Sequence, residues 1–143
     1  MSGAGESEVV VSGIVGGLPD RTVGAAVRHV LRRERRRARI AVTFVGKRQM
    51  RRLNAMYLRH DRPTDVLSFS LLQPDGALAG DIYVCRYVAT RNARAHHATV
   101  RQELLRLIVH GTLHILGFEH PEGAGRTGSA MWRRQERHLA GLR

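Results

Sequence analysis

The chain has 143 residues, with 24 Lys and Arg against 12 Asp and Glu, so its formal net charge is +12. This length predicts one small domain over residues 1–143, with a flexible lead-in over about residues 1–8, and excludes a multidomain machine. The 43% of apolar residues can build a core, which excludes wholesale disorder, and the single cysteine excludes an intrachain disulfide and favours a reducing, cytoplasmic location.

The first half of the chain alternates strand and helix patterns. A β-branched run at residues 9–15 predicts a strand, and Pro-Asp then opens a helix over 19–38 whose apolar positions recur every three or four residues. A second β-branched run at 40–46 predicts another strand, and a glycine ends it before a helix over 47–58.

The second half begins with two more strands. The patterns at 65–72 and 80–85 are apolar and rich in β-branched or aromatic residues, and the turn signal Pro74-Asp75-Gly76 lies between them. These segments bring the predicted sheet to four strands.

Three helices are predicted to complete the fold. They cover 86–97, the segment from a cap at Thr99 to a stop at Gly117, and 129–142, with a loop over 121–128. The sequence thus predicts a single α+β domain, with a roughly four-stranded mixed sheet packed against about five helices. The helix after Thr99 is the most apolar, so we expect it to be central and buried. No window approaches the roughly 20 apolar residues of a membrane span, and we expect no membrane partner.

The predicted first helix carries an unusual run of arginines. Like charges at helical spacing repel one another, so this face is either screened by solvent or covered by a polyanion, and the sequence leaves both readings open. The arginines are Arg28, Arg32, Arg33, Arg35, Arg36, Arg37 and Arg39.

Three histidines form the strongest chemical motif of the chain. His110 and His114 are four residues apart, which places both rings on one face of a helix, and a turn at Gly117 can return His120 as a third ligand. This spacing matches the metzincin pattern H-E-x-x-H-x-x-G-x-x-H. Gly111 replaces its general-base glutamate, so the pattern predicts a metal site at the end of the central helix rather than a protease.

Three imidazoles with an open fourth position favour one catalytic Zn²⁺ with a bound water, although nickel, cobalt or copper could use the same nitrogens. The alternative is a set of surface histidines in a His-rich chain. For the remaining histidines we expect surface or structural roles; these are His29, His60, His96, His97 and His138.

Several motifs together resemble the YbeY family of bacterial ribosomal-RNA maturation endoribonucleases. They occur in family order and are Leu53-Asn54, Tyr57, Asp61, Pro63 to Phe69, Gly80-Asp81-Ile82 and His110 to His120. The resemblance implies a zinc-dependent, single-strand-specific endoribonuclease that trims the 3′ end of small-subunit ribosomal RNA and contributes to ribosome quality control. It also implies that His110, His114 and His120 are the zinc ligands.

The resemblance also marks one candidate catalytic residue. The family has a basic residue directly after the motif tyrosine, but here Leu58 follows Tyr57 and Arg59 comes one position later. Arg59 is therefore our candidate for phosphate binding or catalysis, against the alternative of a solvated charge. For Asp65 and Asp81 we favour a turn, or a hydrogen bond to a ligand histidine, over direct catalysis.

The residues leave several alternatives open. The nucleophile is either a metal-activated water or the RNA 2′-OH. A non-catalytic, ribosome-associated RNA-binding factor with a structural zinc is the second hypothesis, and a metal hydrolase of peptides or small molecules is the third. RNA and the ribosome are the expected partners, while ribosomal or GTPase protein partners stay unknown.

Overall fold

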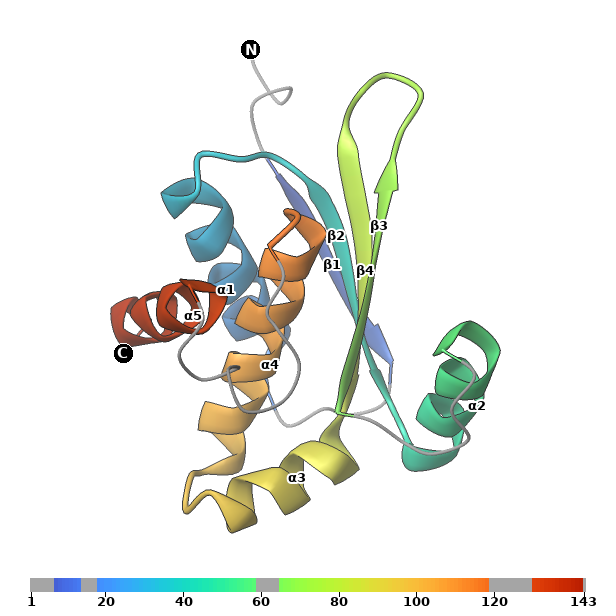
Figure 1. Ribbon diagram of the computed structural model, residues 1–143, viewed down its shortest axis with the longest axis vertical. Helices are drawn as coiled ribbons and strands as arrows, with labels where there is room; N and C mark the ends of the chain where they lie inside the picture. The colour runs from blue at the N-terminus through green and yellow to red at the C-terminus, as the bar shows by residue number, and fades with distance from the viewer. Residues whose placement is uncertain (1–6, 14–17, 59–64, 119–129, 143) are drawn as a thin grey trace.

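The computed structural model describes residues 7–13, 18–58, 65–118 and 130–142, apart from the side chains of Leu58 and Leu72. The α+β class, the four-stranded mixed sheet and the five helices predicted from the sequence are confirmed (Figure 1). The elements are β1 (Glu8–Gly13), α1 (Asp20–Arg33), β2 (Arg39–Val45), α2 (Lys47–Leu58), β3 (Val66–Leu72), β4 (Leu78–Cys85), α3 (Arg86–Ala95), α4 (Val100–Ile115) and α5 (Ala130–Gly141).

The sheet has the strand order β1-β2-β4-β3. Strands β1, β2 and β4 are parallel, and β3 is antiparallel to β4 at one edge. The predicted turn joins β3 to β4: the Gly76 N–H donates to the Gln73 carbonyl at 2.9 Å, and Gly76 has a φ of 85°. A positive φ suits glycine, because it has no Cβ to clash with the backbone.

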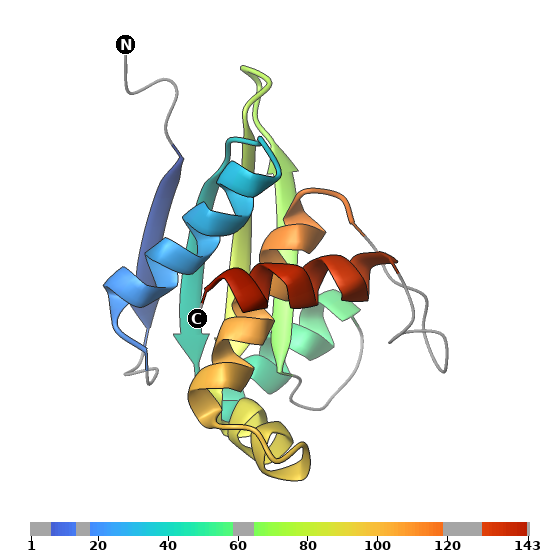
Figure 2. The ribbon, with the colours of Figure 1, turned by 90° about the vertical axis from the view of Figure 1, so that its left-hand side faces the viewer.

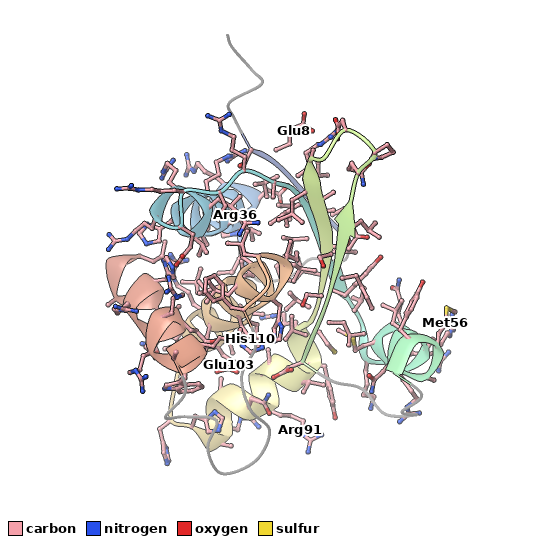
Figure 3. All side chains as sticks on the ribbon, turned by 45° about the horizontal axis from the view of Figure 1, so that its top comes forward. Glu8, Arg36, Met56, Arg91, Glu103 and His110 are labelled. Atoms are coloured by element: carbon pink, nitrogen blue, oxygen red, sulfur yellow. The ribbon has the colours of Figure 1, made fainter. Side chains whose placement is uncertain are left out.

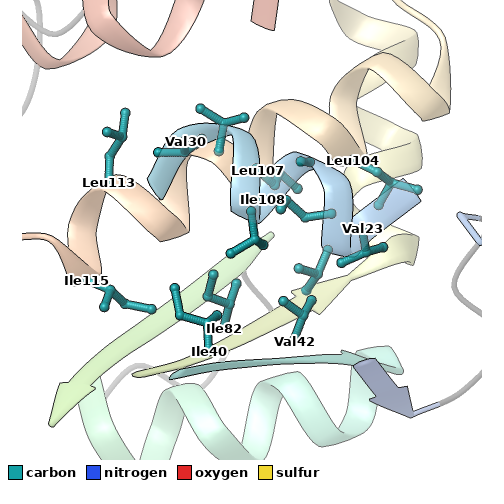
Figure 4. Close-up of a cluster of buried hydrophobic side chains, with 14 of the residues drawn as sticks. Val23, Val30, Ile40, Val42, Ile82, Leu104, Leu107, Ile108, Leu113 and Ile115 are labelled. Atoms are coloured by element: carbon teal, nitrogen blue, oxygen red, sulfur yellow. The ribbon is translucent and has the colours of Figure 1, made fainter. Parts of the chain in front are cut away.

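The helices cover the two faces of the sheet unequally. Helices α1, α4 and α5 lie on one face, with α5 crossing over α4, whereas α2 lies on the other (Figures 1 and 2). The main core fills the space between α1, α4 and the strands (Figure 4). Val27 of α1, Ile108 and Leu113 of α4 and Ile82 of β4 are all fully buried. Each such side chain stabilises the fold by about 1.5–3 kcal/mol. Helix α4 is thus central, as its apolar sequence predicted.

Helix α1 ends earlier than predicted, at Arg33 instead of residue 38. Glu34 caps it, and Arg35 then turns the chain with a φ of 56°. The Arg36 N–H donates to the Leu31 carbonyl at 2.9 Å, which closes the helix in a Schellman turn. Such a turn normally contains glycine, and none stands here to mark the end of the helix, so our boundary was wrong.

The other boundaries differ little from the prediction. Helix α3 ends two residues early because His97 has a φ of 54°, and β1 covers Glu8–Gly13 instead of 9–15. The predicted loop over 121–128 and most of the lead-in lie outside the described residues. Within the part of the chain that the structure describes, no helix is both long and apolar enough to cross a bilayer.

Candidate metal centre

Both ends of α4 are fixed by local hydrogen bonds. At the start, Thr99 and Gln102 form a capping box: the Gln102 N–H donates to the Thr99 hydroxyl at 3.0 Å, and the Thr99 N–H donates to the Gln102 side chain at 2.8 Å. At the end, Gly117 has a φ of 100°, and the Phe118 N–H donates to the Leu113 carbonyl at 3.0 Å. The last two turns of α4, which carry the paired histidines, are thereby held in a defined direction.

His110 and His114 lie one helical turn apart with their rings in contact. The ring centroids are 4.6 Å apart and the ring planes are inclined by 68°. His120 and Arg59 lie outside the described residues, so the complete ligand set and the role of Arg59 stay predictions. Among residues 7–13, 18–58, 65–118 and 130–142, no group of three metal-binding side chains comes together.

A buried glutamine on α5 orients the first of these histidines. Gln135 is 2% exposed, and its Oε1 lies 2.7 Å from Nδ1 of His110. The Gln135 Nε2 donates to Glu136 at 3.2 Å, which identifies the other amide atom as the oxygen. An amide oxygen only accepts, so Nδ1 of a neutral His110 carries the hydrogen and Nε2 carries the lone pair. A metal-binding histidine is held in this way, because its second nitrogen donates to a neighbouring oxygen.

Behind Gln135, an ion-pair network joins α4 to α5. Arg106 lies one turn before His110 and donates from Nε and Nη2 to the two carboxylate oxygens of Glu136, both at 3.1 Å. Arg106 also donates to the buried Glu103 at 3.4 Å. The hydrogen bond with Glu136 raises the pKa of Arg106 more than burial lowers it. Arg106 therefore stays charged and neutralises both carboxylates, and Figure 3 shows Glu103 and His110 on α4.

Gly111 explains why the metzincin glutamate is missing. A Cβ at this position would lie 2.9 Å from Cγ2 of Ile82 on β4. The helix thus approaches the sheet too closely for a side chain here. A glutamate could not be accommodated at residue 111 without separating α4 from β4, so the prediction against a metzincin-type protease has a structural reason.

The two aspartates singled out from the sequence have different surroundings. Asp65 accepts a hydrogen bond from Asn92 of α3 at 3.2 Å, and its backbone carbonyl accepts from Cys85 at 2.9 Å. These contacts join Asp65 to α3 and to the end of β4, so its predicted turn role stays a prediction. Asp81 lies between Gly80 and Ile82, which both face α4. Because strand residues alternate between faces, Asp81 points to the opposite face and cannot support the α4 histidines.

Two of the remaining histidines take part in a clamp between α1 and α5. The His138 Nε2 donates to the Glu34 carboxylate at 2.7 Å, and Arg134 donates to the same carboxylate at 2.7 and 2.9 Å. The His29 ring lies 5.7 Å from that of His138, and burial followed by nearby positive charge lowers the pKa of His29. This clamp is structural, whereas His96 is exposed.

Gln135 is the site residue that sequence reasoning did not assign. It stands in the buried stripe of α5 with Met131, His138 and Leu139. A glutamine at a position with core spacing needs a hydrogen-bond partner, and this signal was available in the sequence. The identity of the partner could not be predicted from the sequence, because only the fold brings residues 110 and 135 together.

Comparison with known proteins gives consistent matches. The family model described as Endoribonuclease YbeY matches residues 18–143. The protein named Endoribonuclease YbeY from Chloroherpeton thalassium is 34% identical over 87% of this chain and 87% of its own length. That from Thermotoga petrophila is 35% identical over 70% of this chain and 65% of its own length.

A solved structure agrees with these matches. The solution structure of TM1509 from Thermotoga maritima superposes with a TM-score of 0.67 and 28% sequence identity, and the match covers 94% of this chain and 88% of that protein. The similarity thus extends from the sequence motifs to the arrangement of the whole fold.

Proposed function

This chain belongs to the endoribonuclease YbeY family, and we propose that it is a metal-dependent endoribonuclease for single-stranded RNA. Its proposed task is to mature the 3′ end of small-subunit ribosomal RNA in the cytoplasm and to take part in ribosome quality control. The net charge of +12 suits an RNA substrate. The observation that carries the proposal is the His110 and His114 pair, with His110 oriented by Gln135.

The donor chemistry of the pair fits a divalent metal. His110, His114 and His120 would hold Zn²⁺, since three neutral imidazoles are a common ligand set of catalytic zinc. When bound, the metal would supply a Lewis acid and lower the pKa of water toward about 7. Gln135 fits this role because it fixes the tautomer of His110 through Nδ1.

Residues of the chain itself would orient the ligand histidine and contact the phosphate. Gln135 and the ion pairs of Arg106 keep the first ligand from rotating, so a ligand histidine is preorganised before the substrate arrives. At residue 111 itself glycine supplies no carboxylate, unlike the glutamate of the metzincin pattern, so a general base at this position is not part of the proposal. Arg59 is our candidate for that phosphate contact.

The test compares metal-quantified wild type with His114→Ala on labelled single-stranded RNA, with DNA and duplex RNA of the same sequence as further substrates. His96→Ala is the matched control, because His96 is an exposed histidine at the end of α3. We expect His114→Ala to lose cleavage while it keeps the circular dichroism spectrum of the wild type, and His96→Ala to cleave normally.

The product ends then identify the nucleophile. A 5′-phosphate would indicate attack by water, whereas a 2′,3′-cyclic phosphate and resistant DNA would indicate attack by the RNA 2′-OH. Equal cleavage by wild type and a folded His114→Ala would contradict the proposal and point to a contaminating nuclease. RNA binding without any cleavage would favour the ribosome-associated binding factor.

A further inference from the structure

A cavity of about 620 Å³ lies at the C-terminal end of α1 and is unusually rich in arginine. It is lined by Ser7, Leu31, Arg28, Arg32, Arg35, Arg36 and Arg37. All five arginine residues are exposed, and Figure 3 labels Arg36 among them. Five positive charges around one hollow are mutually repulsive, so an anion that enters it lowers the electrostatic energy.

The chain offers this cavity no balancing acid among the residues that the structure describes. Glu34 is the acidic residue within the same turn, but its carboxylate is engaged by Arg134 and His138 on α5. The ion pairs found in the described ranges include none between a carboxylate and an arginine of the cavity. Within the described residues, the positive charge of the cavity is therefore not neutralised by an ion pair.

The backbone that presents these arginines is also strained. Helices α1 and α4 end in the same Schellman turn, but α4 has Gly117 at the left-handed position, with a φ of 100°, and α1 has Arg35, with a φ of 56°. A left-handed conformation is unfavourable for a residue with a Cβ. Glycine would suit the turn of α1 better, as it would suit the end of α3, where His97 has a φ of 54°. At α1 the residue that bears this strain is an arginine of the cavity.

The cavity is connected to the helix of the candidate metal centre. Arg36 donates from Nη1 to the carbonyl of Leu116 at 3.4 Å, and Leu116 is the C-cap of α4, two residues after His114. A polyanion bound in the cavity would therefore lie beside the end of α4 that carries His114.

We propose that the arginine cavity is an anchoring site for the backbone phosphates of single-stranded RNA, separate from the histidines. The inference rests on the proposed function for the identity of the polyanion. Guanidinium groups bind phosphate oxygens through paired N–H donors, and arginine suits this contact better than lysine. The site recognises the sugar-phosphate backbone and is not selective for base sequence.

The test measures RNA binding without cleavage. Chelator-treated protein is titrated into a fluorescein-labelled single-stranded RNA, and anisotropy is followed at several salt concentrations. The cavity variant is Arg32→Gln/Arg37→Gln. The matched control is Arg21→Gln/Arg91→Gln, which removes the same charge from the far end of α1 and from the exposed face of α3. A folding check by circular dichroism accompanies each protein.

We expect only the cavity variant to bind RNA more weakly, on the order of tenfold at 0.1 M salt. The slope of the logarithm of its binding constant against the logarithm of the salt concentration should be smaller by about 1.4, which is about 0.7 for each of the two lost phosphate contacts. If both double variants bind alike, general charge explains the binding and the inference is overturned. Absence of binding by chelator-treated wild type also overturns it. Loss of nuclease activity would leave these binding results unaffected, so the inference and the proposed function can fail separately.

A single substitution provides an independent arm of the test. Arg35→Gly removes one cavity charge and relieves the left-handed strain, so we expect its thermal midpoint to rise while its RNA affinity falls severalfold. A merely structural role for Arg35 predicts the higher midpoint with unchanged affinity, and that outcome overturns the inference.

Discussion

Replacement of Gly80 by alanine tests the close contact that holds the histidine helix against the sheet. A Cβ at Gly80 of β4 would lie 2.5, 2.7 and 2.9 Å from Cδ1, Cγ1 and Cγ2 of Ile115. Ile115 is 3% exposed and directly follows His114. Because three atoms of the isoleucine are too close, a rotation of its outer end cannot relieve the clash, and the last turn of α4 must shift.

The size of the effect follows from packing energetics. Overpacking of a filled core costs about 1–3 kcal/mol. Alanine recovers about 0.4–1 kcal/mol because it restricts the unfolded chain more than glycine does. We therefore expect Gly80→Ala to lower the free energy of unfolding by about 1–2 kcal/mol. Ile115→Ala should lower it by about 2–5 kcal/mol through loss of burial and the cavity that it leaves.

The double variant provides the decisive measurement. In Gly80→Ala/Ile115→Ala the new methyl group enters the space that the isoleucine leaves, so the loss should be at least about 1 kcal/mol smaller than the sum of the single losses. Urea unfolding of the metal-free proteins, followed by circular dichroism, gives all three values. Gly46→Ala is the control, because a Cβ there meets nothing within 4 Å and should change stability by no more than about 0.5 kcal/mol.

Two outcomes would refute this reasoning. If the two single effects simply add, residues 80 and 115 do not compete for the same space. If Gly80→Ala is as mild as Gly46→Ala, α4 is not held at the distance that the structure shows. Both outcomes would also remove the reason given for Gly111, since the contact of Gly111 with Ile82 belongs to the same interface between α4 and β4.

Further predictions concern the site and the elements around it. Gln135→Leu should weaken zinc binding by about 10–100-fold in a competition titration with a chromogenic chelator, because Nδ1 of His110 loses its acceptor; unchanged affinity would contradict the orienting role. Thr99→Ala should destabilise the fold by about 1 kcal/mol in urea unfolding, and an unaltered midpoint would show that the cap is dispensable. Burial raises the pKa of Glu34, but the hydrogen bonds from Arg134 and His138 of α5 outweigh it and bring the pKa below the ordinary 4.5. Because the pKa of Glu34 is lower in the folded protein than in the unfolded chain, the unfolded chain is protonated at this carboxylate first as the pH falls. The stability of the fold should therefore decrease as the pH drops below 4.5. Glu34→Gln should make this decrease smaller in thermal scans from pH 7 to 3.

Much of the fold was predictable because each element carries its own local signal. The apolar stripe of α4 identified the central helix, and Thr99 and Gly117 marked its two ends in the sequence as they do in the structure. The strand patterns gave four strands. Their order could not be predicted, because the pairing of β2 with β4 depends on packing between segments far apart in the chain.

The candidate site was predictable to the extent that it is local. Helical pitch alone places His110 and His114 on one face of α4, and the structure puts their rings in contact. Gln135 could not be assigned, because a hydrogen bond over 25 residues of sequence depends on how α5 crosses α4. Sequence patterns therefore found the proposed ligands and missed the side chain that orients one of them.

The wrong boundary of α1 is informative in its own right. The expectation that a glycine marks the end of a helix identified the end of α4, because Gly117 occupies the left-handed position there. It failed at α1, because Arg35 occupies the same position in the same kind of turn. Natural sequences break such local rules mainly at functional or strained sites. At this turn the exception adds a fifth arginine to a cavity that holds no carboxylate partner within the described ranges. His97 takes the same position at the end of α3 with a φ of 54°, so the misfit alone does not locate a site. What distinguishes the turn of α1 is that its left-handed residue also lines the arginine cavity that we propose as the RNA anchor.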